Sequence, residues 1–393
     1  MKRLGLHPAI WATASTHFVT DAYGNMYAPL LPLLIPRLHL SLPTIGVLAM
    51  CYQLASSFSQ LGFGALADRW RPRVLLMGGP VLSVVVLSLI GSATTVPMLA
   101  ALLLIGGLGG AAFHPPAAAL VHAVSGPRKG LAMSTHISGG SLGFALAPLC
   151  FAPLVARVGP AWAWCVALPG LVALTYTLRL IYRVHIPRAH ETQRWDLLRP
   201  YVKPLALLYT IVVLRTLTAS SLSVFLPVLL TRQGMGVSEA SAAVTLYLFV
   251  SSIGGFLGGP LADRFGPRLV IIWTLVASVP FLWLGQLTSG WTLAVLVSVG
   301  GLFLQSTLPI NVTYGQQIAP VSAATVSSLM MGFAWGVGSL MAPAIGLLGD
   351  RLGLSTALMI TAVVPLLAAV AAIPLPPVTS ARERPSLAPP ATP

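Results

Sequence analysis

The stretch Gly64-Ala-Leu-Ala-Asp-Arg-Trp-Arg-Pro-Arg73 is a short basic break between two long apolar runs, and it occurs twice. Its second copy is Gly259-Pro-Leu-Ala-Asp-Arg-Phe-Gly-Pro-Arg268, in which Asp263 corresponds to Asp68 at an offset of 195 residues. A repeat at half the chain length predicts two structurally equivalent halves. In a membrane protein, a parallel repeat of this kind is typical of a transporter whose halves rock about a shared midplane site.

The composition predicts a membrane protein. Hydrophobic residues make up 56% of the 393 residues and charged residues only 8%, with a mean hydropathy of +0.86. So little charge could not cover a water-soluble surface. Apolar runs long enough to cross about 30 Å of hydrocarbon recur along the chain, and we predict twelve spanning helices. The predicted spans are Ala9–Ile35, Leu42–Leu66, Val74–Ala93, Val96–Ala123, Gly130–Val155, Ala161–Tyr182, Pro204–Leu230, Glu239–Ala262, Leu269–Leu287, Trp291–Ile318, Ser322–Gly349 and Ser355–Ile373.

The repeat and the spans predict an all-α polytopic fold of two pseudo-symmetric six-helix bundles. The expected segments are a bundle over 1–182, a cytoplasmic linker over 183–203, a second bundle over 204–376 and a disordered tail over 377–393. Cys51, Cys150 and Cys165 all fall inside predicted helices, which argues against a disulfide framework or a paired metal motif.

Lysine and arginine are expected to stay on the cytoplasmic side of the membrane when they lie in short loops. With the N-terminus inside, 17 of the 22 basic residues face the cytoplasm, four face outward, and Arg215 lies within a helix. This distribution predicts that both termini are cytoplasmic in a bacterial-type inner membrane. The formal net charge of +14 then reflects inner loops facing anionic lipid, so we expect no nucleic-acid partner.

The repeated Gly-x-Leu-Ala-Asp-Arg pattern resembles the loop signature of the major facilitator superfamily of secondary transporters. Three further stretches resemble its fosmidomycin-resistance branch of drug exporters. These stretches are His17-Phe-Val-Thr-Asp-Ala-Tyr23 with Pro29-Leu-Leu-Pro32, Gly107-Leu-Gly-Gly-Ala-Ala-Phe-His-Pro115, and Gly139-Gly-Ser-Leu-Gly-Phe-Ala-Leu-Ala-Pro148. The resemblance implies a drug exporter driven by proton exchange, with helices 1, 4, 7 and 10 around a central cavity.

The chain departs from this family pattern at three positions. Arg71 stands where the first loop would carry Gly, and Pro116 and Gln317 stand where we would expect Glu. If those carboxylates carry protons in relatives, coupling in this chain is in question.

The resemblance also implies that the repeated loop is a conformational latch. Acidic and basic side chains at these helix ends can pair with each other or with a nearby helix N-terminus and so hold the cytoplasmic side shut. The alternative is that they only neutralise one another and fix topology. The predicted latch residues are Asp68, Arg69, Arg73, Asp263, Arg264 and Arg268.

Two charged residues lie near the middle of predicted helices, where an ionised side chain costs roughly 2.5 to 3.5 kcal/mol on insertion scales. These are Asp21 in helix 1 and Arg215 in helix 7, and the 195-residue offset places Thr20 opposite Arg215. We predict that Arg215 binds an anionic or polar substrate group and that Asp21 takes protons. The alternative is a fixed Asp21–Arg215 ion pair that joins the halves and touches no ligand.

Histidines and uncharged polar residues complete the candidate site. His17 lies one turn from Asp21, so the two can act together in proton coupling or share only a hydrogen bond. His114 precedes two prolines that would leave carbonyls free to line a cavity. The predicted substrate-binding residues are Arg215, His114, Asn311, Gln305 and Tyr314. We expect His136 and Trp335 to serve mainly in packing.

The sequence therefore predicts a secondary transporter, most consistent with proton-coupled efflux of small polar or anionic drugs and metabolites by alternating access. The alternatives are an importer or exchanger of an anionic metabolite and, more remotely, a scaffold or receptor that has lost transport. No phosphate-binding Gly-rich loop, metal-ligand spacing or nucleophile–base pattern is visible, so we expect no enzyme activity, no metal and no cofactor beyond the proton gradient. The expected partners are a small-molecule substrate, protons and lipid, and we expect a monomer.

Overall fold

The computed structural model describes residues 6–69, 71–126, 128–184, 199–319, 326 and 329–376, without the side chains of 61, 68, 69, 129 and 130. The helices of the first half are α1 (Pro8–Gly24), α2 (Tyr27–Leu38), α3 (Leu42–Gln53), α4 (Ser59–Arg69), α5 (Pro72–Ser88), α6 (Val96–Val124), α7 (Lys129–Val158) and α8 (Ala167–Tyr182). Those of the second half are α9 (Val202–Arg232), α10 (Val237–Phe265), α11 (Pro267–Gly285), α12 (Gly290–Ile318), α14 (Ala334–Ser339), α15 (Ala342–Leu352) and α16 (Leu354–Ala372).

Ten helical stretches in the described ranges are long and apolar enough to cross a membrane. The first two predicted spans are each divided into shorter pieces. Ala9–Ile35 is α1 and α2, which separate at Asn25, and Leu42–Leu66 is α3 and α4 with a π-helix at Leu54–Phe58 between them. A second π-helix, Leu329–Phe333, precedes α14. The predicted all-α polytopic membrane fold is confirmed.

The repeated loop ends one helix and begins the next in both halves. Pro72 and Pro267 occupy the first turn of α5 and α11, where proline's fixed φ and missing N–H suit a helix start. Gly266 has φ 87°, a conformation that only glycine adopts freely. Its counterpart Arg71 has φ −96°, so the substitution noted in the sequence gives the first loop a different backbone.

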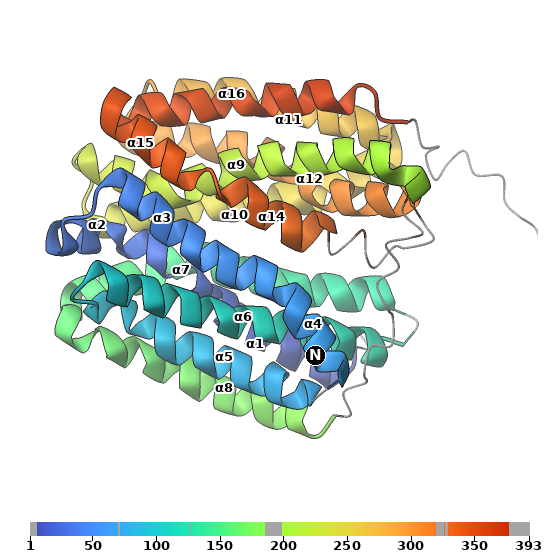
Figure 1. Cartoon of the computed structure of the whole chain (residues 1–393), viewed down its shortest axis with the longest axis horizontal. Helices are drawn as coiled ribbons and strands as arrows, with labels where there is room; N and C mark the ends of the chain where they lie inside the picture. The colour runs from blue at the N-terminus through green and yellow to red at the C-terminus, as the bar shows by residue number, and fades with distance from the viewer. Residues whose placement is uncertain are drawn as a thin grey trace, which may run out of the picture.

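The helices of each half gather on their own side of the molecule (Figure 1). The two groups meet tightly where α3 lies against α15, because Gly46 contacts the Ala342 carbonyl and Gly346 contacts the Leu42 carbonyl with no room for a side chain. Small residues allow helix backbones to approach this closely in membranes. Residues 185–198 and 377–393 of the predicted linker and tail lie outside the described residues, and the segment boundaries stay a prediction.

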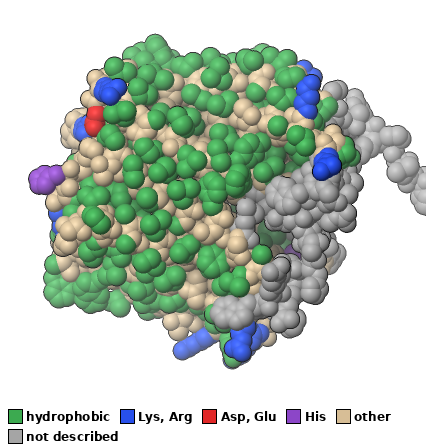
Figure 2. Space-filling model, in the orientation of Figure 1, with side chains coloured by type: hydrophobic (Ala, Val, Ile, Leu, Met, Phe, Trp, Pro, Cys, Tyr) green, Lys and Arg blue, Asp and Glu red, His purple; other side chains and the backbone are tan. Residues whose placement is uncertain are grey.

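The outer surface is apolar over its middle. Figure 2 shows hydrophobic side chains spread across the face, with lysines and arginines toward its two ends. Val172 is 72% exposed and Tyr176 69% exposed, both on α8. Exposed apolar area on this scale fits a lipid-facing surface and not a water-facing one.

Candidate functional site

Asp21 lies between two histidine rings that come from different helices. His17 Nε2, one turn earlier on α1, is 3.1 Å from Asp21 Oδ2, and His114 Nε2 on α6 is 3.7 Å from Asp21 Oδ1. The two imidazole rings meet edge to face with centroids 5.0 Å apart. The predicted proton-coupling pair and one predicted substrate residue thus form a single cluster, which we call the His–Asp cluster (His17, Asp21 and His114).

The hydrogen bonds of His17 determine what this cluster can hold. Its Nδ1 is 3.0 Å from the backbone carbonyl oxygen of His136 on α7. A carbonyl can only accept, so Nδ1 carries a proton, and a neutral ring then has a lone pair on Nε2. A carboxylate facing that lone pair would be repelled, so the His17–Asp21 contact needs one further proton. The pair can therefore store a proton.

Helix α7 presses against α1 through three glycines around this cluster. Gly139 contacts the Ala14 carbonyl and Gly143 contacts the Phe18 carbonyl, and neither has room for a side chain. A Cβ on Gly140, between them, would lie 2.5 Å from both Asp21 Oδ2 and His17 Nε2. Gly140 therefore provides the space in which the pair forms.

Arg215 anchors a second polar cluster, in the other half of the chain. Its side chain is fully buried; Nη1 donates a short hydrogen bond to Gln305 Oε1 on α12, and Nη2 donates to Thr216 Oγ1 at 3.1 Å. The guanidinium carbon lies 5.2 Å from the centre of the Trp335 ring on α14. A cation over an indole face is favourable, which explains part of how the buried charge is accommodated.

The arginine cluster (Arg215, Gln305 and Trp335) and Asn311, six residues after Gln305 on α12, contain buried polar atoms without partners among the described residues. Arg215 Nε and both amide atoms of Asn311 form no hydrogen bond with the described residues. Buried donors and acceptors are rarely left unpaired, so such atoms point to water or to a ligand. The cluster can therefore offer further hydrogen bonds to an anionic or polar group.

The two clusters occupy equivalent places in the repeat. An offset of 195 residues relates Thr20 to Arg215, Gly110 to Gln305 and Gly140 to Trp335. In the first half Gly140 leaves room for His17 and Asp21, and a Cβ on Gly110 would lie 4.0 Å from His114 Nε2, whereas in the second half Gln305 and Trp335 contact the Arg215 guanidinium. One scaffold thus presents an acidic, imidazole-containing half and a cationic half.

The structure contradicts the alternative that Asp21 and Arg215 form a fixed ion pair. In the described residues, Asp21 forms ion pairs with His17 and His114, and Arg215 forms none. The contacts that each charged side chain makes with described residues come instead from its own half. Asp21 and Arg215 are therefore not paired with each other in this structure.

The two π-helices bring aromatic rings together across the halves. Phe58 and Phe333 meet edge to face with centroids 4.7 Å apart, and Tyr209 lies 6.3 Å from Phe333. Gly336 lies directly against the Phe58 ring. A π-helix inside a longer helix frequently marks a functional position, because the extra residue disturbs the regular bonding.

The described latch residues make contacts within their own halves. Arg73 donates to the Val184 carbonyl at 3.1 Å and lies 4.9 Å from the centre of the Tyr182 ring. Arg264 lies 5.1 Å from the centre of the Phe265 ring, and Asp263 and Arg268 form no ion pair with described residues. The side chains of Asp68 and Arg69 lie outside the description, so the latch stays a prediction.

Two further outcomes concern individual residues. Tyr314 is buried on α12, but its hydroxyl donates a short hydrogen bond to the Pro376 carbonyl and makes no hydrogen bond with the arginine cluster. Trp335 and His136, expected mainly to pack, contact Arg215 and His17 respectively. Gly140 was not predicted at all, although the repeat offset that pairs it with Trp335 was available in the sequence.

The donor atoms of the His–Asp cluster lie within 4.8 Å of one another, and this is the group that could hold a metal ion among the described residues. Imidazole nitrogen and carboxylate oxygen are common ligands for divalent transition metals. The expectation that the protein uses no metal stays a prediction.

Comparisons with known proteins agree with this architecture. The sequence profile of the Major Facilitator Superfamily matches residues 13–214 and 208–392. The chain is 30% identical to the fosmidomycin resistance protein of Escherichia coli (strain K12), covering 91% of this chain and 90% of that protein. It is 27% identical to the uncharacterized MFS-type transporter YfnC of Bacillus subtilis (strain 168), covering 93% and 92%.

A solved structure supports the fold independently of sequence. The chain is similar to a bacterial homologue of the human lysosomal transporter Spinster in an inward-facing and occupied conformation, with a TM-score of 0.79 and 17% identity. The match covers 92% of this chain and 95% of that one. Because the sequence profile and the full-length relatives both span nearly the whole chain, this protein belongs to the major facilitator superfamily of membrane transporters, in which it resembles the fosmidomycin-resistance branch.

Proposed function

We propose that this protein is a proton-coupled exporter of small anionic or polar compounds that works by alternating access. The observation that carries the proposal is the separation of two opposite clusters, each completed within its own half. The His–Asp cluster can hold a proton, and the arginine cluster can hold an anion. An exchanger needs these two functions in one cavity without a fixed bond between them.

The substrate side of the proposal rests on Arg215. A buried guanidinium without a carboxylate partner is expensive, and an anionic ligand would supply the missing charge. Its unpaired Nε offers a directional donor to phosphonate or carboxylate oxygens. Trp335 covers one side of the guanidinium and provides an apolar wall.

The proton side rests on Asp21 and its two histidines. If Asp21 were paired with Arg215, an anion that bound Arg215 would leave the Asp21 carboxylate unpaired and so favour its protonation. Anion and proton would then be transported in the same direction. With Asp21 paired to histidines instead, proton binding is not tied to anion binding in this way. The inside-negative potential also drives an anion outward, by roughly 2.3 kcal/mol per charge per 100 mV.

The name of one relative supports export over import. The E. coli relative is named for resistance to fosmidomycin, and we propose that the present chain exports compounds of that kind. We further propose an inner-membrane location with both termini cytoplasmic, no cofactor besides the proton gradient, and a monomer. The start of α1 and the end of α16 lie toward the same end of the molecule in Figure 1, which is consistent with both termini on one side of the membrane, and the distribution of basic residues supports the cytoplasmic side.

Transport by purified protein in liposomes tests the proposal. Fosmidomycin serves as the probe, with an imposed pH gradient and a fluorescent dye reporting proton flux. We expect probe-dependent proton flux in the wild type, loss of probe transport in Arg215→Ala, and probe binding without pH-driven transport in Asp21→Asn. Arg232→Ala, on the predicted outer side, is the control for lost positive charge.

The same measurement separates the alternatives. Proton and probe moving in the same direction would identify an importer, and probe exchange independent of pH would identify an anion exchanger. Unchanged flux in both Arg215→Ala and Asp21→Asn would remove the assigned site altogether.

A further inference from the structure

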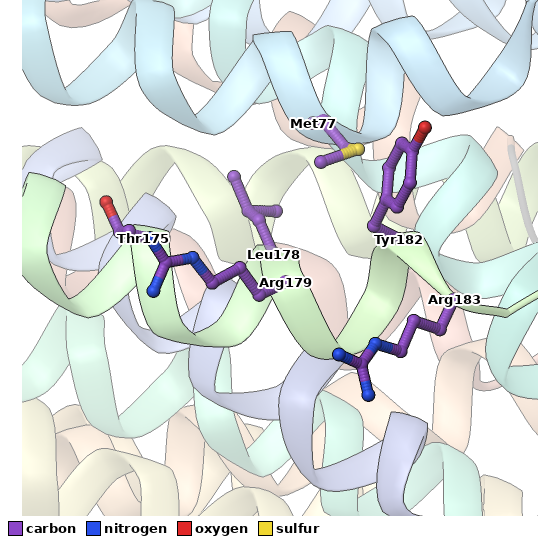
Figure 3. A pocket seen from close by; sticks show the side chains of 6 residues that line it. All are labelled: Met77, Thr175, Leu178, Arg179, Tyr182 and Arg183. Atoms are coloured by element: carbon purple, nitrogen blue, oxygen red, sulfur yellow. The ribbon is translucent and has the colours of Figure 1, made fainter.

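A pocket of about 410 Å³ opens on the side of the molecule between α5 and α8, away from the two clusters (Figure 3). Its lining comes from Met77 on α5 and from one face of α8 and the residue that follows it. The lining residues are Met77, Thr175, Leu178, Arg179, Tyr182 and Arg183. Those on the α8 side recur at intervals of three and four, so they share one helix face.

The pocket has a cationic rim over an apolar floor. Arg179 and Arg183 are exposed, whereas Leu178 is buried and Met77 half-buried. Neither arginine forms an ion pair with a carboxylate in the described residues. A third arginine borders the pocket, because Arg73 stacks on Tyr182 and donates to the Val184 carbonyl beside it.

The position along the membrane identifies the ligand chemistry. Arg183 directly follows the last residue of α8, and in the predicted orientation this end faces the cytoplasm. Two to three turns further into the membrane, the same helix exposes Tyr176 and Val172, which are 69% and 72% exposed. The cations thus lie at headgroup depth and the apolar surface at acyl-chain depth, as a phospholipid requires.

The fold itself does not require these cations. The repeat relates the groove between α5 and α8 to one between α11 and α16, where Ile272 corresponds to Met77 and Pro374 corresponds to Arg179. Arg183 corresponds in the sequence to Val378, so the second half has no arginine at the positions equivalent to Arg179 and Arg183, although Arg268 corresponds to Arg73. Topology explains why this loop is basic, but not why two arginines border a pocket.

We propose that this pocket binds the headgroup of an anionic phospholipid from the cytoplasmic leaflet. Arg179 and Arg183 would contact the phosphate, Tyr182 would lie at the interface, and one acyl chain would run along the exposed face of α8. This inference is independent of the transport direction and of the two clusters.

Native mass spectrometry of the detergent-purified full chain tests the inference. The protein is titrated with dioleoyl phosphatidylglycerol and, separately, with dioleoyl phosphatidylethanolamine, which has the same acyl chains. Removing both charges in Arg179→Gln/Arg183→Gln should weaken binding of the first phosphatidylglycerol about 30-fold, at about 1 kcal/mol per arginine and tenfold per about 1.4 kcal/mol. Binding of phosphatidylethanolamine should not change.

A matched control removes two exposed cations elsewhere at the same predicted leaflet, in Arg199→Gln/Lys203→Gln, and should retain phosphatidylglycerol. An equal loss in this control would overturn the proposal, as would an equal loss of phosphatidylethanolamine. Displacement of phosphatidylglycerol by millimolar inorganic phosphate would assign the pocket to free phosphate instead. Should the double variant not fold, the single variants Arg179→Gln and Arg183→Gln decide, with about a fivefold loss expected for each.

Discussion

The substitution Gly140→Ala, which adds one methyl group, should break the His17–Asp21 contact and so abolish most pH-driven transport. The new Cβ would lie 2.5 Å from both Asp21 Oδ2 and His17 Nε2, well inside van der Waals contact. Helix α7 cannot move away to relieve the clash without breaking the close contacts of Gly139 and Gly143 with the α1 backbone. One of the two side chains must therefore leave, and the 3.1 Å His17–Asp21 contact is lost.

The size of the effect follows from that lost contact. A hydrogen bond to a charged group contributes about 1.5 to 3 kcal/mol, which corresponds to roughly 10- to 150-fold in an equilibrium. We therefore expect Gly140→Ala to reduce pH-driven transport of the probe anion by one to two orders of magnitude. Binding of the probe to the arginine cluster should remain, because that cluster is built from other helices.

The assay compares pH-gradient-driven fosmidomycin transport with equilibrium binding of fosmidomycin in detergent. Gly78→Ala on α5 is the matched control, since a Cβ there meets nothing within 4 Å. Thermal unfolding of both variants shows whether the protein still folds. Transport by Gly140→Ala at the rate of Gly78→Ala, with wild-type coupling, would refute the assignment of His17 and Asp21 to proton storage.

Three further perturbations have definite expected outcomes. Trp335→Ala should weaken probe binding about 2- to 30-fold, because a cation–π contact to Arg215 contributes about 0.5 to 2 kcal/mol. Trp335→Phe should retain most of the affinity, and titration calorimetry measures the Kd of both variants. Equal Kd values for Trp335→Ala and the wild type would contradict a role for the Trp335 ring in binding. Gly266→Ala should lower the free energy of unfolding by more than about 1 kcal/mol, since its φ is 87°. Chemical denaturation in detergent measures this free energy. Gly259→Ala should lower it less, because position 259 has open space for a Cβ. Phe58→Ala should slow transport and leave the Kd for the probe unchanged, because in the described part of the chain the ring joins the two halves through Phe333 and Gly336 and does not stack on the Arg215 side chain; a weakened Kd would place the ring in the binding site instead.

The repeat made the fold predictable, because one offset applied to twelve apolar runs fixes both the helix number and their equivalence. What sequence could not give was where the helices break. Asn25, the residue at which α1 ends, donates from its side chain to the Phe144 carbonyl on α7 at 2.8 Å, a contact between residues far apart in the chain. The π-helices at Leu54–Phe58 and Leu329–Phe333 likewise carry no proline that would reveal them.

The candidate site was predictable in its charges and not in its pairings. Asp21 and Arg215 were conspicuous because ionised residues are rare inside apolar runs. Their partners depend on which side chain reaches across a helix interface, and periodicity along one helix does not contain that information. Gly140 shows this most clearly, because it contributes only the space that the His17–Asp21 contact occupies. It has no functional group that would single it out in the sequence.

The division of the site between the halves has a consequence for coupling. His17, Asp21 and His114 are held by α1, α6 and α7, and Arg215, Gln305 and Trp335 by α9, α12 and α14, so rocking of one half against the other leaves each cluster intact. Under the proposed alternating access, rocking would instead change which side of the membrane reaches the clusters and how far apart they lie. Under the proposed function, proton and anion are then linked through the position of the halves and not through a shared bond. Because a ligand shifts a conformational equilibrium only by its difference in affinity for the two states, each cluster must bind its ligand more tightly in one orientation than in the other.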